Sequence, residues 1–137
     1  MPDSVRFHFL STTNSNSPTD LMPYLPVELE RNSKINKTEA LLDTGASVNV
    51  LPYGIGLLLG AIWEEQTTAL TLDGNLANYE ARALLVTLKV AEFLPVNLAF
   101  AWTKAENLPV ILGQVNFFLE FDVCFFRSQG FFEIKPK

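Results

Sequence analysis

Short apolar runs separated by turn-forming residues set the strongest limit on how this chain can fold. Several of these runs alternate apolar and polar residues, as a half-buried strand does. The clearest spans residues 79–90, in which Leu84, Val86, Leu88 and Val90 share one face. This period-two pattern predicts a mainly β structure.

The remaining runs extend that prediction along the chain. Between two of them, Asp73-Gly74-Asn75 is a strong hairpin-turn signal. Two short helices are expected, at residues 53–59 and 114–120. We therefore predict an all-β fold, a closed or nearly closed β-barrel with one or two short helices. The predicted strands are residues 5–10, 25–30, 38–42, 47–51, 68–72, 79–90, 93–100, 108–112, 121–126 and 131–135.

The length of 137 residues suits one compact domain. Residues 11–20 are polar and rich in turn formers, which is typical of a loop or a flexible arm. We therefore divide the chain into an N-terminal strand with a flexible arm at residues 1–20 and a main domain at residues 21–137. The N-terminal strand is then a candidate to dock separately from the main body.

Composition excludes several kinds of function. One cysteine and one histidine exclude an internal disulfide, the usual Cys/His zinc frameworks and any mechanism that needs two histidines. A net charge of −5 argues against a nucleic-acid partner. The most apolar block, residues 54–63, is too short to cross a bilayer. With no signal peptide visible, we expect a cytoplasmic protein with no membrane partner.

Two segments stand out as candidates for an active site. The first is a hydrophobic run that ends in Asp43-Thr44-Gly45-Ala46, and the second is Val110-Ile111-Leu112-Gly113. Their glycines are 113 − 45 = 68 positions apart. This pairing resembles the retropepsin-like aspartic proteases, single-lobe relatives of pepsin, over roughly residues 25–135.

The resemblance implies a role for each motif. An Asp-Thr-Gly loop would supply the catalytic carboxylate, here that of Asp43, while a hydrophobic segment ending in glycine crosses behind it. The hairpin at residues 68–86 would be a flap that closes over an extended peptide. The residues implied to support the catalytic loop are Thr44, Gly45, Ala46 and Gly113, and those near the substrate are Asp73, Gly74 and Asn75.

The chemistry of peptide hydrolysis makes a matching demand. One carboxylate must deprotonate a water while a second, protonated, polarises the scissile carbonyl. Two carboxyls at hydrogen-bond distance share a proton, so acid pH should favour activity. The other Asp-Gly pair, Asp73-Gly74, lacks an intervening Thr or Ser, so the partner of Asp43 must be Asp43 of a second copy. We therefore expect a homodimer that acts on a peptide or protein substrate without a metal or organic cofactor.

Other interpretations remain open at this point. Asp43 alone could be a strand-end residue in an ordinary turn, since Asp and Gly both favour turns. The chain could also be a non-catalytic dimeric module that grips extended peptides by strand addition. A third possibility is a monomer that becomes active only on assembly with a partner.

The glycines and the single histidine and cysteine have simpler interpretations. Gly54-Ile55-Gly56 with Gly60 does not match a nucleotide-binding spacing, so packing of a short helix is expected. His8 should face solvent, and Cys124, between apolar neighbours, should be a buried hydrophobe. Glu64-Glu65 should be solvated surface.

Aromatic residues are unusually frequent, with 11 phenylalanines and two tryptophans. Trp63 and Trp102 are expected in the core. Adjacent residues of a strand face opposite sides, so Phe125-Phe126 and Phe131-Phe132 cannot all face one core. This predicts a second apolar surface near the C-terminus, with a dimer interface as its natural cover.

Overall fold

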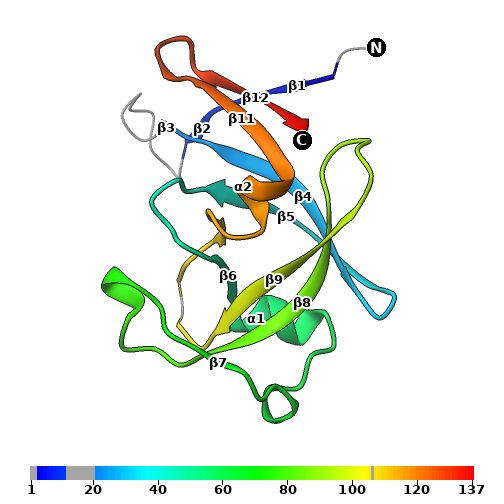
Figure 1. Cartoon of the computed structure of the whole chain (residues 1–137), viewed down its shortest axis with the longest axis vertical. Helices are drawn as coiled ribbons and strands as arrows, with labels where there is room; N and C mark the ends of the chain where they lie inside the picture. Colours follow the sequence, from blue (N-terminus) through cyan, green and yellow to red (C-terminus); the bar gives the residue numbers. More distant parts are fainter. Residues whose placement is uncertain (1–2, 12–20, 106) are drawn as a thin grey trace.

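The structure is a computed structural model that describes residues 3–11, 21–105 and 107–137. It is mainly β with two short α-helices, as predicted (Figure 1). Most of the expected flexible arm falls on residues 12–20, outside the described residues, so the division at residue 20 stays a prediction. The strands are β1 (Val5–His8), β2 (Leu10–Ser11), β3 (Leu21–Met22), β4 (Tyr24–Arg31), β5 (Lys34–Leu42), β6 (Asn49–Pro52), β7 (Ala69–Leu70), β8 (Ala81–Lys89), β9 (Val96–Thr103), β10 (Val110–Leu112), β11 (Phe121–Phe126) and β12 (Phe131–Pro136); the α-helices are α1 (Tyr53–Leu58) and α2 (Phe117–Glu120), and short 3₁₀ helices span Trp63–Glu65, Gly74–Leu76 and Arg127–Gln129.

Six strands of the described chain close into a barrel in the order β4-β5-β10-β6-β9-β8. The barrel closes where β8 pairs back to β4 in antiparallel register, for example Leu29 with Leu88. The two-residue strand β7 pairs with β8 next to this ring. The predicted closed barrel is therefore confirmed (Figure 1).

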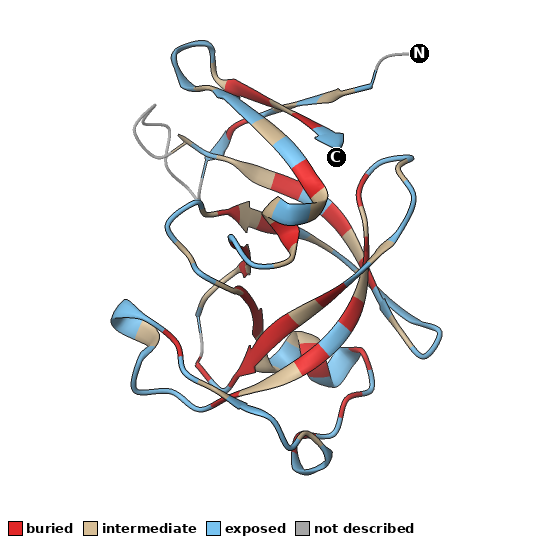
Figure 2. Cartoon of the chain, in the orientation of Figure 1, coloured by how far each residue is buried: buried red, intermediate tan, exposed pale blue. Residues whose placement is uncertain are grey.

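The alternation along β8 explains why this segment forms a barrel strand. Leu84, Val86 and Leu88 are buried, whereas Leu85 between them is 71% exposed. Figure 2 shows the same alternation of buried and exposed positions along the ribbon. Because successive side chains point to opposite faces, this pattern places one face against the core and the other outward.

Trp102 of β9 is fully buried and fixes the position of α1. Its indole Nε1 donates to the carbonyl oxygen of Tyr53 at 3.1 Å, and the Tyr53 ring stacks on it at 5.5 Å. A Cβ added to Gly56 would lie 2.2 Å from the indole ring. Gly56 therefore serves helix packing, as expected, and Trp63 is also in the core at 4% exposure.

A second sheet, in the order β1-β12-β11, carries the C-terminal phenylalanines. Phe132 faces the core and stacks on Phe7 at 5.6 Å, so β1 packs onto its own chain instead of docking separately. Phe131 faces the other side, where Phe126 and the guanidinium of Arg6 cover it. Phe131 is only 8% exposed, so its cover comes from the same chain and needs no second copy.

Two smaller expectations about exposure have opposite outcomes. His8 is exposed, as predicted. Cys124 is exposed and not buried, so that prediction was wrong. The reason is that β11 is an edge strand of its sheet and Cys124 lies on the face opposite the core-facing residues of β12. No helix in the described part of the chain is long and apolar enough to span a membrane.

Candidate active site

Asp43 lies directly after β5, and hydrogen bonds hold both its backbone and its carboxylate. Its backbone N–H donates to the carbonyl oxygen of Leu112 in β10 at 3.0 Å. Its carboxylate Oδ1 accepts the backbone N–H of Gly45 at 2.9 Å. A Cβ at Gly45 would lie 3.3 Å from that same oxygen, which is a tight contact. Glycine therefore allows the close approach that holds the half-buried carboxylate in one orientation.

The strand β10 lies between the two strands that flank the Asp43 loop. It runs parallel to β5, pairing Leu112 with Leu42, and antiparallel to β6, pairing Ile111 with Val50. In Figure 1, β10 is the short, unlabelled yellow-orange arrow between β5 and β6. β10 thus joins β5, which precedes Asp43, to β6, which follows the loop. We call residues 110–115 the crossing segment.

The residues after β10 continue this attachment along the loop itself. The backbone N–H groups of Gln114 and Val115 donate to the carbonyl oxygens of Ala46 and Ser47, each at 2.9 Å. The Gln114 side chain donates through Nε2 to the Thr44 carbonyl oxygen at 2.8 Å. Three loop carbonyls, those of Thr44, Ala46 and Ser47, are therefore hydrogen-bonded to Gln114 and Val115.

Gly113 is required by this close contact. A Cβ at this position would lie 2.6 Å from the carbonyl oxygen of Val48 and 2.7 Å from that of Ala46. Both neighbours are backbone atoms, which cannot rotate away as a flexible side chain can. The geometry agrees with the expectation that Gly113 gives close approach from the crossing strand.

Asn49 takes part in the same arrangement, and sequence analysis did not identify it. This residue of β6 is fully buried, accepts the Gly113 N–H through Oδ1 at 2.8 Å and donates through Nδ2 to the Ala99 carbonyl at 3.1 Å. The available signal was a polar amide in the middle of the apolar run Val48 to Leu51.

The predicted flap is a longer connection than a tight hairpin turn. β7 and β8 do pair as a hairpin, but residues 71–80 connect them and contain the 3₁₀ helix Gly74–Leu76. Leu72 is only 3% exposed and packs in a small apolar cluster with Val50 and Ala101. The chain leaves strand geometry here because Leu72 and its neighbours fill this cluster.

Asp73 connects this flap segment to the Asp43 loop. Its Oδ2 accepts a hydrogen bond from the Ser47 hydroxyl at 2.9 Å. Gly74 lies beside it with a φ of 61°, in the left-handed region that favours glycine. Asn75 is exposed. Asp73 and Gly74, but not Asn75, line the cavity next to Asp43.

That cavity has a volume of about 210 Å³ and lies between the loop and the flap segment. Its walls are largely aliphatic, and Asp43 and Asp73 are the two acidic residues among them. It could therefore hold an apolar side chain of a bound peptide beside the Asp43 carboxylate. The lining residues are Asp43, Gly45, Ala46, Ser47, Val48, Val50, Leu72, Asp73, Gly74, Leu76 and Ile111.

A separate groove of about 430 Å³ includes Thr44 of the same loop. Apolar residues from four different segments surround it, and Met22 and Phe125 are each 37% exposed there. A larger hollow of about 750 Å³, bordered by Glu28, Lys37 and Lys89, contains no residue of the Asp43 loop. The lining residues of the groove are Phe9, Leu21, Met22, Pro23, Leu42, Thr44, Phe125 and Arg127.

Comparison with known proteins identifies the class of fold. No protein-family model matches the sequence, and no curated protein matches it. The structure is similar to a retropepsin-like aspartic protease from Rickettsia conorii, with a TM-score of 0.70 at 13% identity, covering 97% of this chain and 92% of that chain. It is also similar to EIAV protease, solved in complex with the inhibitor HBY-793, with a TM-score of 0.50 at 24% identity, covering 74% of this chain and 86% of that chain.

The chain therefore has a retropepsin-like fold, the fold of the single-lobe aspartic proteases. The likeness extends over almost the whole of both chains in the Rickettsia comparison. At 13% and 24% identity the similarity shows the fold alone. The resemblance first noted on the two short motifs is therefore confirmed for the fold.

Proposed function

We propose that this chain is an aspartic endopeptidase that acts as a homodimer, with Asp43 of each copy forming one active site. The observation that carries the proposal is the way in which hydrogen bonds hold Asp43 in place. Its backbone and one carboxylate oxygen are hydrogen-bonded, and Asp43 borders a cavity with largely aliphatic walls. A carboxylate placed in this way is preorganised to act on a water molecule beside a bound peptide.

Hydrolysis would proceed through one water held between the two carboxyl groups. The ionised carboxylate takes a proton from the water as its oxygen attacks the scissile carbonyl carbon. The protonated carboxyl, that of Asp43 of the partner subunit, donates to the carbonyl oxygen as negative charge develops there. The first carboxyl then passes the proton taken from the water to the amide nitrogen, and the C–N bond breaks. One hydroxyl of the intermediate returns its proton to Asp43 of the partner subunit, which leaves a carboxylic acid and an amine and restores the carboxyl pair. This chemistry uses only carboxyl groups and water, so it needs no metal or organic cofactor.

The surface around Thr44 supports the homodimer. Two Asp43 carboxyls can share a proton only if a two-fold axis passes beside them, so residues adjacent to Asp43 must face the second copy. Thr44 lines the groove of about 430 Å³, where Met22 and Phe125 remain partly exposed. Apolar surface left open at this position favours a second copy of the chain as its cover.

The flap segment supports a peptide or protein as substrate. Residues 71–80 lie against the Asp43 loop through Asp73 and Leu72. An extended peptide would lie between this segment and the loop, where closure excludes water from the reaction. We also infer a cytoplasmic location, in which the exposed thiol of Cys124 stays reduced.

The test is cleavage of a fluorogenic peptide library between mildly acidic and neutral pH, with the wild-type protein and Asp43→Asn. Asp43→Asn should abolish cleavage while binding of the same peptides, followed by fluorescence anisotropy, persists. Asp122→Asn is the matched control, because Asp122 is an exposed residue on β11. This control should cleave at the wild-type rate.

The other outcomes separate the competing functions. Peptide binding without cleavage by the wild-type dimer would support the non-catalytic module and contradict the enzyme. Equal cleavage by wild type and Asp43→Asn would remove Asp43 from the chemistry altogether.

A further inference from the structure

The peptide group between Leu112 and Gly113 makes two hydrogen bonds, one to Asp43 and one to Asn49. Its carbonyl oxygen accepts the backbone N–H of Asp43 at 3.0 Å, and its N–H donates to Asn49 Oδ1 at 2.8 Å. The C=O and N–H of one peptide unit lie in the same plane and cannot turn independently. The contact to Asn49 therefore fixes the orientation of the carbonyl that holds Asp43.

Asn49 is itself fixed at both ends of its amide. It lies on β6, between β10 and β9 in the barrel, and its exposed fraction is 0%. The amide oxygen faces the Gly113 N–H, and the amide nitrogen donates to the Ala99 carbonyl of β9 at 3.1 Å. The reverse orientation would oppose donor to donor and acceptor to acceptor, so both contacts select one rotamer. Asn49 thus connects Gly113 to the neighbouring barrel strand β9.

We propose that Asn49 is a positioning residue for the Asp43 carboxylate, acting through the Leu112–Gly113 peptide group. The catalytic part of this inference rests on the proposed endopeptidase function. A shared proton and an attacking water require the two carboxyls to keep their geometry closely, so a small displacement of the loop lowers the catalytic rate. Asn49 itself neither contacts Asp43 through a hydrogen bond nor lines the cavity, although its chain neighbours Val48 and Val50 do line it. Its side chain bonds instead to Gly113 and Ala99, so the Leu112–Gly113 peptide group is its direct link to Asp43.

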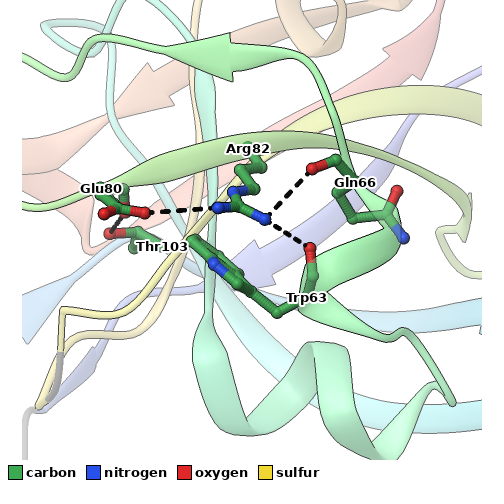
Figure 3. A network of polar contacts seen from close by, with 5 residues as sticks. All are labelled: Trp63, Gln66, Glu80, Arg82 and Thr103. Atoms are coloured by element: carbon green, nitrogen blue, oxygen red, sulfur yellow. Dashed lines mark hydrogen bonds and ion pairs between the residues drawn. The ribbon is translucent and has the colours of Figure 1, made fainter.

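The experiment compares Asn49→Leu with a matched variant, Thr103→Val. Asn49 and Thr103 are the two polar residues that are fully buried in the described part of the chain. Thr103 Oγ1 donates to the Glu80 carbonyl at 2.8 Å and accepts the Ala105 N–H at 3.2 Å, so its loss also removes two hydrogen bonds to backbone groups. Figure 3 shows that Thr103 lies with Glu80 and Arg82, a group that includes no residue of the Asp43 loop.

Two readouts are measured on both variants. Hydrogen exchange at the Asp43 amide should quicken about tenfold in Asn49→Leu relative to amides of β4 and β5, as expected for loss of one supporting hydrogen bond. It should not change in Thr103→Val. The catalytic constant kcat should fall about tenfold or more in Asn49→Leu with KM within about twofold, since the loop loses alignment and not its binding surface.

Specific outcomes would overturn the proposal. An unchanged Asp43 amide in Asn49→Leu, or equal losses of protection and kcat in both variants, would reduce Asn49 to a general structural role. If Asn49→Leu does not fold, Asn49→Ser, which leaves room for a bridging water, tests the same contact. If the wild-type protein cleaves no peptide, the proposed function fails while hydrogen exchange still decides whether Asn49 positions the loop.

Discussion

Replacing Gly113 with alanine tests the crossing of β10 behind the Asp43 loop. The added Cβ would lie 2.6 Å from the Val48 carbonyl oxygen and 2.7 Å from that of Ala46. Ordinary contact begins at 3.4 Å, so the two segments must separate by up to 3.4 − 2.6 = 0.8 Å. Such a shift also stretches the 2.9 Å hydrogen bonds from Gln114 and Val115 to the loop. Overpacking of about 1–3 kcal/mol and two hydrogen bonds of about 1 kcal/mol each predict a loss of about 3–5 kcal/mol in unfolding free energy.

Urea unfolding at one fixed protein concentration measures this loss, with the fluorescence of the buried tryptophans as signal. The control is Gly54→Ala, because a Cβ at Gly54 has no neighbour within 4 Å and lies in α1. That variant should be unchanged or more stable by about 0.5 kcal/mol. The reasoning is refuted if Gly113→Ala unfolds within about 1 kcal/mol of the wild-type protein.

Three further predictions concern the flap segment, the contacts of Arg82 and the carboxyl pair. Ser47→Ala removes the 2.9 Å hydrogen bond to Asp73, so hydrogen exchange across residues 71–80 should quicken, while Thr87→Ala, which removes another exposed hydroxyl contact of 2.7 Å, should leave that segment unchanged. Arg82→Met should cost about 1–2 kcal/mol in urea unfolding, because Arg82 donates to two backbone carbonyls at 2.8 and 3.3 Å (Figure 3). Glu80→Gln should cost less than about 0.5 kcal/mol, since its ion pair spans 3.7 Å at an exposed site, and equal losses would contradict this reasoning. The pH profile of kcat/KM should fall from mildly acidic to alkaline pH, because the carboxyl pair must hold one proton, and a flat profile would contradict that requirement.

Much of the fold could be predicted because local sequence patterns express it. The alternation in residues 79–90 predicts β8, and the burial of Leu84, Val86 and Leu88 agrees. The Asp-Thr-Gly motif and the Leu112-Gly113 segment predicted a close approach, and the backbone contacts of Gly113 agree with it. A short stretch of residues determines the geometry of β8, whereas the contact at Gly113 joins segments whose glycines lie 68 positions apart and was expected from the family resemblance.

The missed features depend on contacts between distant parts of the chain. Asp73-Gly74 suggested a tight turn, but the burial of Leu72 among residues of other strands favours a longer connection. Asn49 looked like one polar residue in an apolar strand, and its importance appears only when Gly113 and Ala99 lie on either side of it. No local pattern encodes such a three-strand contact.

The outcome for the phenylalanines has the same explanation. The sequence requires Phe131 and Phe132 to face opposite sides, and they do. It does not reveal that Arg6 and Phe126 of the same chain cover Phe131. Under the proposed homodimer, the surface that we assign to the second copy is the groove beside Thr44, which Phe125 also lines.

A subunit-mixing experiment tests most directly the claim that two chains share one active site. Wild-type and Asp43→Asn chains are unfolded together in equal amounts, refolded, and assayed for peptide cleavage at constant total protein. If one Asp43 from each copy is required, only wild-type pairs cleave, and activity falls to about a quarter of the all-wild-type value. Activity of about a half would show that each chain carries a complete site, and would contradict the shared dyad.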